Sequence, residues 1–303
     1  MEVYLDNSAT TKPSAAAVAA MERCLTEAWH NPSALYKPAL TAEKELTRAR
    51  EDCLAALDAK GERLYFTSCG TEADNLAILG HLRTVKKAGR VLILCVEHPA
   101  VLNCADEIKR LGHSVELIPV DGHGIADLTA LEAMLDDTVR MICCMQVNNE
   151  SGAIQPLAEI VKLRDAKCPD AAVHVDGVQG FLRVPLSFRK LKLQSYAFSG
   201  HKIHGPKGVG ALVVRKDFKL NPVLFGGGQE DGFRSGTENM PGILGMAEAV
   251  RTYPSDGAEK MMHIKRMLWD ALKAAVPQAE LNGPSLEDEA CAPHILNVSF
   301  PPV

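Results

Sequence analysis

The sequence has 303 residues, with 33 Lys and Arg against 38 Asp and Glu and a formal net charge of -5. This charge balance excludes a basic nucleic-acid-binding chain, and a hydrophobic content of 47% excludes a disordered one. The longest apolar run, 91–96, is too short to span a membrane, and the nine scattered cysteines form neither a disulfide framework nor a CxxC pair. We expect a cytoplasmic protein that binds neither a membrane nor nucleic acid.

Apolar runs of strand length alternate with stretches of helical periodicity as far as residue 215. The predicted strands are 63–67, 90–96, 114–119, 139–147, 171–175, 195–199 and 209–215, and the main helical stretches between them are 71–88, 100–111, 128–135 and 156–166. This alternation predicts an α/β domain in which helices cover a mainly parallel sheet. Ligands bind such sheets beyond the carboxyl ends of the strands, so the residues that follow each strand are the candidates for a site.

The pattern changes after residue 215. A Gly-rich segment, 225–239, leads into a predicted helix, 240–251, and a further helix and a strand-like run, 294–300, follow. We expect a large domain over 14–252 and part of a small α+β domain over 253–303. Residues 1–13 are expected to form an N-terminal segment that packs near the small domain.

Small residues follow the first predicted strand, in the run Ser68-Cys69-Gly70-Thr71 before a helix. Small side chains let backbone N–H groups approach an anion, and the N-terminus of a helix favours negative charge. The run therefore predicts a phosphate site, although an ordinary helix cap by Ser68 or Thr71 explains the same residues.

Polar residues follow the later strands. His98 is a candidate ligand-binding residue or a cap, and the pair Asn148-Asn149 is a candidate site or a turn. Asp176 and Gln179 follow the strand 171–175, where Asp176 is either a ligand-binding acid or an N-cap.

Lys202 follows the strand 195–199 in the segment SGHK. A buried ammonium is costly, and a lysine that bonds covalently to a cofactor avoids that cost. Lys207 is the alternative, within a Gly/Pro-rich turn. A phosphate site, an acid for a pyridine nitrogen, an imidazole and a lysine are together the residues that pyridoxal phosphate requires.

Successive motifs of the chain resemble the signatures of cysteine desulfurases, which are class-V aminotransferase-like enzymes of PLP-dependent fold type I. The motifs are YLDNSATT, TSCGTEADN, EHPAVL, VNNESGAIQP, HVDGVQ, SGHKIHGPKG, GGGQEDGFRSGTEN and HILNVSF. The resemblance implies a three-layer large domain with a small C-terminal domain, pyridoxal 5'-phosphate as cofactor and L-cysteine as substrate. It also implies a homodimer and transfer of sulfur to an iron-sulfur scaffold or another acceptor protein.

The resemblance assigns a role to each candidate residue. Lys202 corresponds to the Schiff-base lysine, Asp176 to the partner of the pyridine nitrogen and His98 to the residue stacked on the ring, and these three are the predicted catalytic residues. Gln179 and Asn149 correspond to residues near the phenolic oxygen of the cofactor. The predicted phosphate-binding residues are Gly70, Thr71, Ser199, His201 and, on the neighbouring subunit, Thr237.

The chain departs from the family pattern in two places. The family's GNPSSxH reads HNPSALY here, with His30 and Tyr36 at the altered positions. The family continues past HILNVSF to a loop with the sulfur-accepting cysteine and a carboxylate-binding arginine, whereas this sequence stops at Val303. We expect this form to bind the cofactor and to desulfurate cysteine poorly, and Cys291 is the candidate for a substitute mobile thiol.

Two other functions fit parts of the sequence. The pairs His174-x-Asp176 and His201-x-x-His204 have spacings that occur in metal sites, which would make the protein a metal-dependent enzyme. The residues that resemble a PLP site are also compatible with a non-catalytic PLP-binding fragment or paralogue. The metal alternative leaves Lys202 and the Gly-rich segment unexplained, and no metal ion is part of the favoured site.

Overall fold

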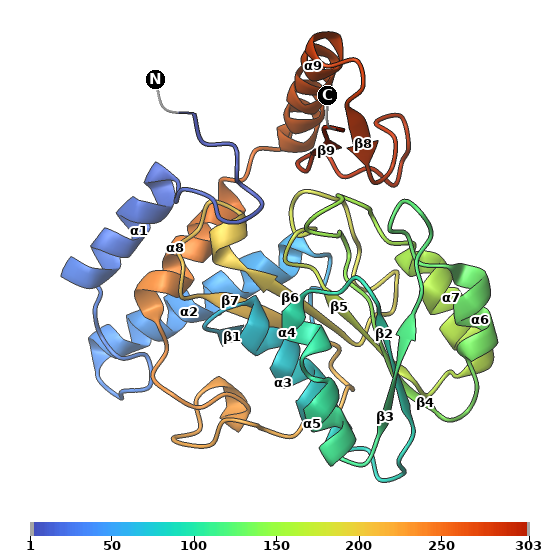
Figure 1. Cartoon of the computed structure of the whole chain (residues 1–303). Helices are drawn as coiled ribbons and strands as arrows, with labels where there is room; N and C mark the ends of the chain where they lie inside the picture. The colour runs from blue at the N-terminus through green and yellow to red at the C-terminus, as the bar shows by residue number, and fades with distance from the viewer. Residues whose placement is uncertain (1–2, 302–303) are drawn as a thin grey trace.

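The computed structural model describes residues 3–301, and its centre is a seven-stranded sheet (Figure 1). The strands are β1 (Arg63–Thr67), β2 (Arg90–Leu94), β3 (Ser114–Ile118), β4 (Val139–Cys143), β5 (Ala172–Asp176), β6 (Ser195–Ser199) and β7 (Gly210–Val214), in the order β1-β7-β6-β5-β4-β2-β3. β7 runs in the direction opposite to the other six strands of this sheet. The predicted α/β fold with a mainly parallel sheet is confirmed.

Helices cover both faces of the sheet. They are α1 (Ala15–Thr26), α2 (Lys37–Ala56), α3 (Gly70–Leu82), α4 (Pro99–Leu102), α5 (Ala105–Arg110), α6 (Leu128–Met134), α7 (Leu157–Lys167) and α8 (Met240–Arg251). In Figure 1, α1 lies against α8, on the side of the sheet that α2 also covers. Among residues 3–301, no helix has the length and apolar character needed to cross a membrane.

The strands are buried on both faces, which explains their continuous apolar runs. In β2, Val91 and Ile93 belong to the core that also contains side chains of α3 and α5, while Leu92 and Leu94 belong to the core that contains side chains of α2, α7 and α8. Alternate side chains of one strand thus contribute to two separate cores. This arrangement makes the large unit a three-layer α/β/α structure.

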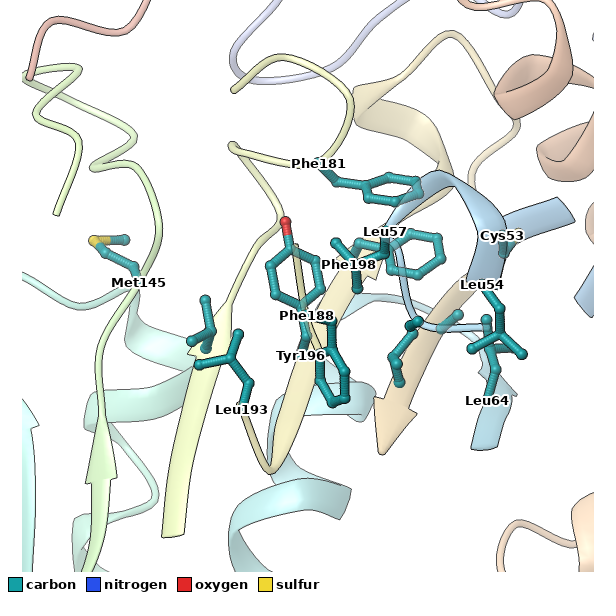
Figure 2. Close-up of a cluster of buried hydrophobic side chains, with 14 of the residues drawn as sticks. Cys53, Leu54, Leu57, Leu64, Met145, Phe181, Phe188, Leu193, Tyr196 and Phe198 are labelled. Carbon is teal, nitrogen blue, oxygen red and sulfur yellow. The ribbon is translucent and has the colours of Figure 1, made fainter. Parts of the chain in front are cut away.

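Aromatic side chains fill the core beneath α2 (Figure 2). Phe181 stacks on Phe198 with ring centroids 3.9 Å apart, and Tyr196 lies beside them. The Tyr196 hydroxyl donates a hydrogen bond of 2.6 Å to the Gln146 side-chain oxygen, so this buried polar group is satisfied. The interaction also fixes the segment that follows β4.

The structure differs from the sequence-based prediction at several boundaries. The predicted helix 100–111 is two helices, α4 and α5, separated at residues 103–104. The predicted strand 139–147 ends at Cys143, because the Met145 N–H donates to the Glu97 carboxylate instead of continuing the ladder with β2. Beyond Cys143 the chain stays bonded to the end of β5, since the Cys144 and Gln146 N–H groups donate to the His174 and Asp176 carbonyls at 3.1 and 2.8 Å.

The last part of the chain forms a smaller unit at the top of Figure 1. It contains α9 (Gly257–Ala275) and an antiparallel pair, β8 (Glu280–Asn282) and β9 (Asn297–Ser299). Ala292 and Ile295 pack on Val147 beyond the end of β4, so this unit lies over the carboxyl edge of the sheet. Residues 1–2 of the predicted N-terminal segment and residues 302–303 of the predicted small domain lie outside the described residues.

A buried ion pair attaches the Gly-rich segment to the first strand. Glu230 accepts two hydrogen bonds from the Arg50 guanidinium, of 2.7 and 3.0 Å, and one of 3.0 Å from the Phe66 N–H. The Glu230 side chain is 3% exposed, whereas that of Arg50 is 26% exposed. The carboxylate therefore joins α2, β1 and the segment that leads to α8.

We predict that Glu230→Gln lowers the free energy of unfolding by about 3 kcal/mol, because removal of one charge leaves the other partly buried and unpaired. Urea denaturation measures this change. Arg189→Gln is the matched control, since the Arg189–Asp58 pair is exposed and its loss costs less than about 1 kcal/mol. Equal losses in the two variants would contradict the structural role of the buried pair.

Candidate functional site

A cavity of about 530 Å³ lies at the carboxyl edge of the sheet, a volume typical of a small-molecule or cofactor site. The predicted residues that line it are Gly70, Thr71, His98, Asn149, Asp176, Gln179, Ser199, His201 and Lys202. The residues that also line it without having been predicted are Asp6, Ser8, Ala9, Cys69, Asp74, Met145, Val147 and Val178. Residues that lie between positions 6 and 202 of the chain therefore converge on one cavity.

The start of α3 forms one wall of the cavity. Cys69 is the N-cap residue, and within residues 3–301 no side chain caps the first turn, so the predicted cap by Ser68 or Thr71 is absent. A Cβ at Gly70 would lie 2.6 Å from the Val178 side chain, so only glycine fits there without a shift. The Ser199 hydroxyl is buried nearby and has no hydrogen-bond partner in the described chain. These features fit an anion bound at the N-terminus of α3.

An ion pair fixes the same turn to the Gly-rich segment. The Arg234 Nε lies 2.6 Å from the Glu72 carboxylate, which also accepts a 2.7 Å hydrogen bond from the Ser68 N–H. The pKa of Glu72 is lowered because these hydrogen bonds outweigh the effect of burial. The turn at the start of α3 is thus held from outside the cavity and its inner side stays free.

Asp176 ends β5 and is 5% exposed. Its Oδ1 accepts a 2.9 Å hydrogen bond from the Val178 N–H, and burial raises its pKa while this hydrogen bond and the charges of His98 and Lys202 lower it. The next residue, Gly177, has no room for a side chain, since a Cβ would overlap the Tyr196 ring. The carboxylate is therefore held rigidly at the cavity and would gain from a cationic partner there.

Lys202 follows β6 in a short 3-10 turn, η1 (Gly200–Lys202). Its Nζ donates to the backbone carbonyls of Ser8 and Ala9, the second at 2.8 Å. Burial lowers the pKa of Lys202, and the nearby charge of Arg183 lowers it further. An amine with a lowered pKa is a candidate nucleophile toward a carbonyl group.

The remaining predicted residues have structural partners as well. The His98 Nδ1 accepts from the Ala100 N–H at 3.1 Å, so His98 caps α4 and also lines the cavity. Asn148 forms the turn, accepting from the Ser151 N–H at 2.8 Å, and this places Asn149 at the cavity. The structural and ligand-binding interpretations of these residues are therefore compatible.

Two predicted residues lie outside the cavity. Thr237 is exposed on the segment before α8 and does not line the cavity of its own chain. Cys291 is 5% exposed, and its sulfur accepts a 2.9 Å hydrogen bond from Lys265. The idea that Cys291 lies on a mobile loop is wrong, because this contact and its packing fix it in the smaller unit.

The N-terminal contribution to the cavity was missed because it depends on a long-range contact. The Thr11 N–H and hydroxyl both donate to the His201 carbonyl at 2.8 Å, and the Gln179 amide donates to the Ser8 carbonyl at 2.8 Å. These contacts bring Asp6, Ser8 and Ala9 to Lys202. Their only signal in the sequence is the polar run DNSATT.

The histidines of the metal alternative have separate partners. His174 bonds to Asp74 at 3.1 Å and to Ser195 at 2.9 Å, and His201 bonds to Thr10 at 3.1 Å. His204 bonds to the Lys12 carbonyl at 3.0 Å. Over residues 3–301, no group of three or more His, Cys, Asp or Glu side chains is arranged to hold a metal ion.

The lowered pKa of His201 makes the stability of the ligand-free protein depend on pH. Burial and the charges of Lys202, Lys207 and Arg183 lower the pKa of His201 to about 4, whereas the unfolded imidazole titrates near 6.5. The unfolded chain binds the extra proton between these values, so the contribution of His201 to stability is lost as pH falls from about 6.5 toward 4.

We therefore predict that the wild type loses more unfolding free energy than His201→Gln when the pH changes from 7 to 5. Urea denaturation of both proteins at each pH measures the difference. All other titrating groups are common to the two proteins, so equal losses would show that the His201 imidazole is not kept neutral by folding.

Comparisons with known proteins agree with this geometry. The aminotransferase class-V family model matches residues 3–303. A cysteine desulfurase of Trichormus azollae is 38% identical over 98% of this chain and 74% of its own length. The cysteine desulfurase NifS of Azotobacter vinelandii is 35% identical over 99% of this chain and 74% of its own length.

Solved structures show the same arrangement. A NifS-like protein superposes with a TM-score of 0.94 and 34% identity, covering 99% of this chain and 82% of its own. The structure described as SspA in complex with cysteine superposes with a TM-score of 0.86 and 28% identity, covering 99% of this chain and 84% of its own.

Proposed function

The chain belongs to the aminotransferase class-V family and, within it, to the cysteine desulfurases, and from this premise we propose that its cavity holds pyridoxal 5'-phosphate and acts on L-cysteine. Members of this family depend on that cofactor. The observation that carries the proposal is the convergence of Lys202, Asp176, His98 and the uncapped start of α3 on one cavity. These groups come from four separate elements of the fold.

The residues of the cavity fit the parts of the cofactor. Gly70, Thr71, Ser199 and His201 would hold the phosphate, where the orphaned Ser199 hydroxyl gains a partner. Lys202 would carry the cofactor through its aldehyde carbon, His98 would contact the ring, and Gln179 and Asn149 would contact its phenolic oxygen. When bound, the cofactor supplies an electron sink that weakens the bonds at the substrate Cα.

Asp176 would keep a proton on the pyridine nitrogen. Two unit charges about 4 Å apart attract by roughly 4 kcal/mol at an effective dielectric constant of 20. This gain also offsets the desolvation of the buried Asp176 carboxylate. The acid thus stabilises the cationic ring, and the cationic ring stabilises the buried acid.

Lys202 would move the proton at the substrate Cα. In the complete reaction the C–S bond of L-cysteine breaks, the carbon takes a proton to give L-alanine, and the sulfur passes to a thiol acceptor as a persulfide. The acceptor would be an iron-sulfur scaffold or another protein. The nine cysteines are all free thiols, which supports a reducing, cytoplasmic location.

We also propose that the site is shared in a homodimer. Trp29, Leu35, Tyr36 and Leu40 are exposed around the start of α2, and Phe225 is exposed at the start of the Gly-rich segment. Such clusters of exposed apolar side chains mark protein–protein interfaces. Thr237 is exposed on the same segment and would reach the phosphate of the neighbouring subunit.

The proposed large and small domains span 14–252 and 253–303, after the N-terminal segment 1–13.

A non-catalytic PLP-binding chain is the second candidate, and one experiment separates the two functions. Wild type, Lys202→Ala and Lys207→Ala are loaded with pyridoxal phosphate, and the borohydride-sensitive absorbance is recorded. Solvent deuterium incorporation at the Cα of L-alanine is then measured, followed by L-alanine and sulfide formation from L-cysteine with dithiothreitol as acceptor.

We predict that Lys202→Ala loses the borohydride-sensitive absorbance and that Cα exchange falls about 10²–10⁴-fold, because the group that moves the proton is gone. Lys207→Ala should match the wild type, since Lys207 is exposed in the turn. Retention of both signals in Lys202→Ala would contradict the proposed site. Cα exchange without formation of L-alanine would instead favour a chain that binds the cofactor but does not transfer sulfur.

A further inference from the structure

Arg183 is a buried cation next to Lys202 that the proposed reaction does not use. It is 4% exposed and lies in the segment that follows β5. Its guanidinium donates to the Gln179 side-chain oxygen at 2.9 Å and to the backbone carbonyl of Lys202.

These contacts close a ring of hydrogen bonds around the lysine. Arg183 bonds to Gln179, the Gln179 amide donates to the Ser8 carbonyl at 2.8 Å, and the Lys202 Nζ donates to the same carbonyl. The bond from Arg183 to the Lys202 backbone completes the ring. Arg183 therefore holds both the backbone of Lys202 and, through Gln179 and Ser8, the acceptor of its amine.

The positive charge of Arg183 is not neutralised by an acid. The ion pairs found within residues 3–301 do not include Arg183, and its hydrogen-bond acceptors are neutral oxygens. A guanidinium stays protonated in proteins even when it is buried. Its field therefore acts on Lys202 at every relevant pH.

Other charged groups also face Lys202. Asp176 and Asp6 raise its pKa, whereas burial and Arg183 lower it, and the net direction is downward. His201 and His294 are neutral near pH 7, because burial and neighbouring cations lower the pKa of each. Arg183 is thus the cation that opposes Asp176 and Asp6 at the amine.

We propose that Arg183 is a positioning residue for Lys202. It holds Lys202 in place, and its unpaired positive charge favours the uncharged form of the Lys202 amine. The uncharged amine is the form that attacks an aldehyde carbon, so this role rests on the proposed function of Lys202. The proposal assigns two effects to one side chain, geometry and charge. Variants of Arg183 that keep only the charge, or only a hydrogen-bond donor, distinguish these two effects.

The test uses the protein without cofactor and follows the amine directly. Wild type, Arg183→Gln, Arg183→Met and Arg183→Lys are labelled with trace acetic anhydride between pH 6 and 10, and mass spectrometry gives the labelling rate of Lys202 relative to Lys207. Arg183→Lys keeps the charge without the two-pronged geometry, Arg183→Gln keeps a donor without the charge, and Arg183→Met removes both. Arg189→Gln, an exposed arginine, is the matched control.

We expect the relative labelling of Lys202 at pH 7 to fall roughly three- to tenfold in Arg183→Gln and Arg183→Met, with the inflection of its pH profile moved upward. Arg183→Lys should keep the wild-type inflection because it keeps the charge, and Arg189→Gln should keep the whole wild-type profile. If both charge-free variants keep that profile, or if Arg183→Lys loses it as fully as they do, the charge role is overturned. If one charge-free variant fails to fold, the other still decides the comparison.

The two proposals fail separately. Cofactor binding by the wild type tests the proposed function, whereas the labelling experiment contains no cofactor and reports only on Lys202. A wild type that binds no pyridoxal phosphate but shows the Arg183-dependent profile would refute the function and keep the electrostatic role. A wild type that binds pyridoxal phosphate but shows no Arg183-dependent labelling profile would refute only the role of Arg183.

Discussion

The common direction of β2, β4, β5 and β6 is the constraint on which the site depends. Because these strands run parallel, their carboxyl ends meet at one edge, and the residues that follow them face the same cavity. His98, Asn149, Asp176 and Ser199 are far apart in the chain and close in space for this reason. The helices on both faces make the edge the accessible place for a ligand.

The same edge concentrates charge in a buried region, and the structure compensates each charge differently. Asp74, which lines the cavity, is hydrogen-bonded to His174, and burial raises the pKa of the acid and lowers that of the imidazole to about 3. Both shifts favour the uncharged form of the group concerned. Asp176 and Lys202 keep their reactive atoms at the cavity, where a cofactor would complete their interactions.

The sequence predicts the parallel sheet and most of the site because both depend on local patterns. Continuous apolar runs mark strands buried on both faces, and Asp176 and Lys202 stand directly after two of them. Asp6, Ser8 and Ala9 could not be predicted in this way, because long-range contacts of the folded chain, such as that between Thr11 and His201, bring them to Lys202. The early end of β4 was missed for a related reason, since the Glu97 side chain replaces a backbone partner there.

The central claim is that the cavity binds pyridoxal phosphate covalently through Lys202, and peptide mapping tests it most directly. Wild-type protein is incubated with pyridoxal phosphate, reduced with borohydride and digested, and the fragments are sequenced by mass spectrometry. The account predicts that the cofactor mass is found on Lys202. Its location on Lys207 or another lysine, or its absence from every peptide, would contradict the account.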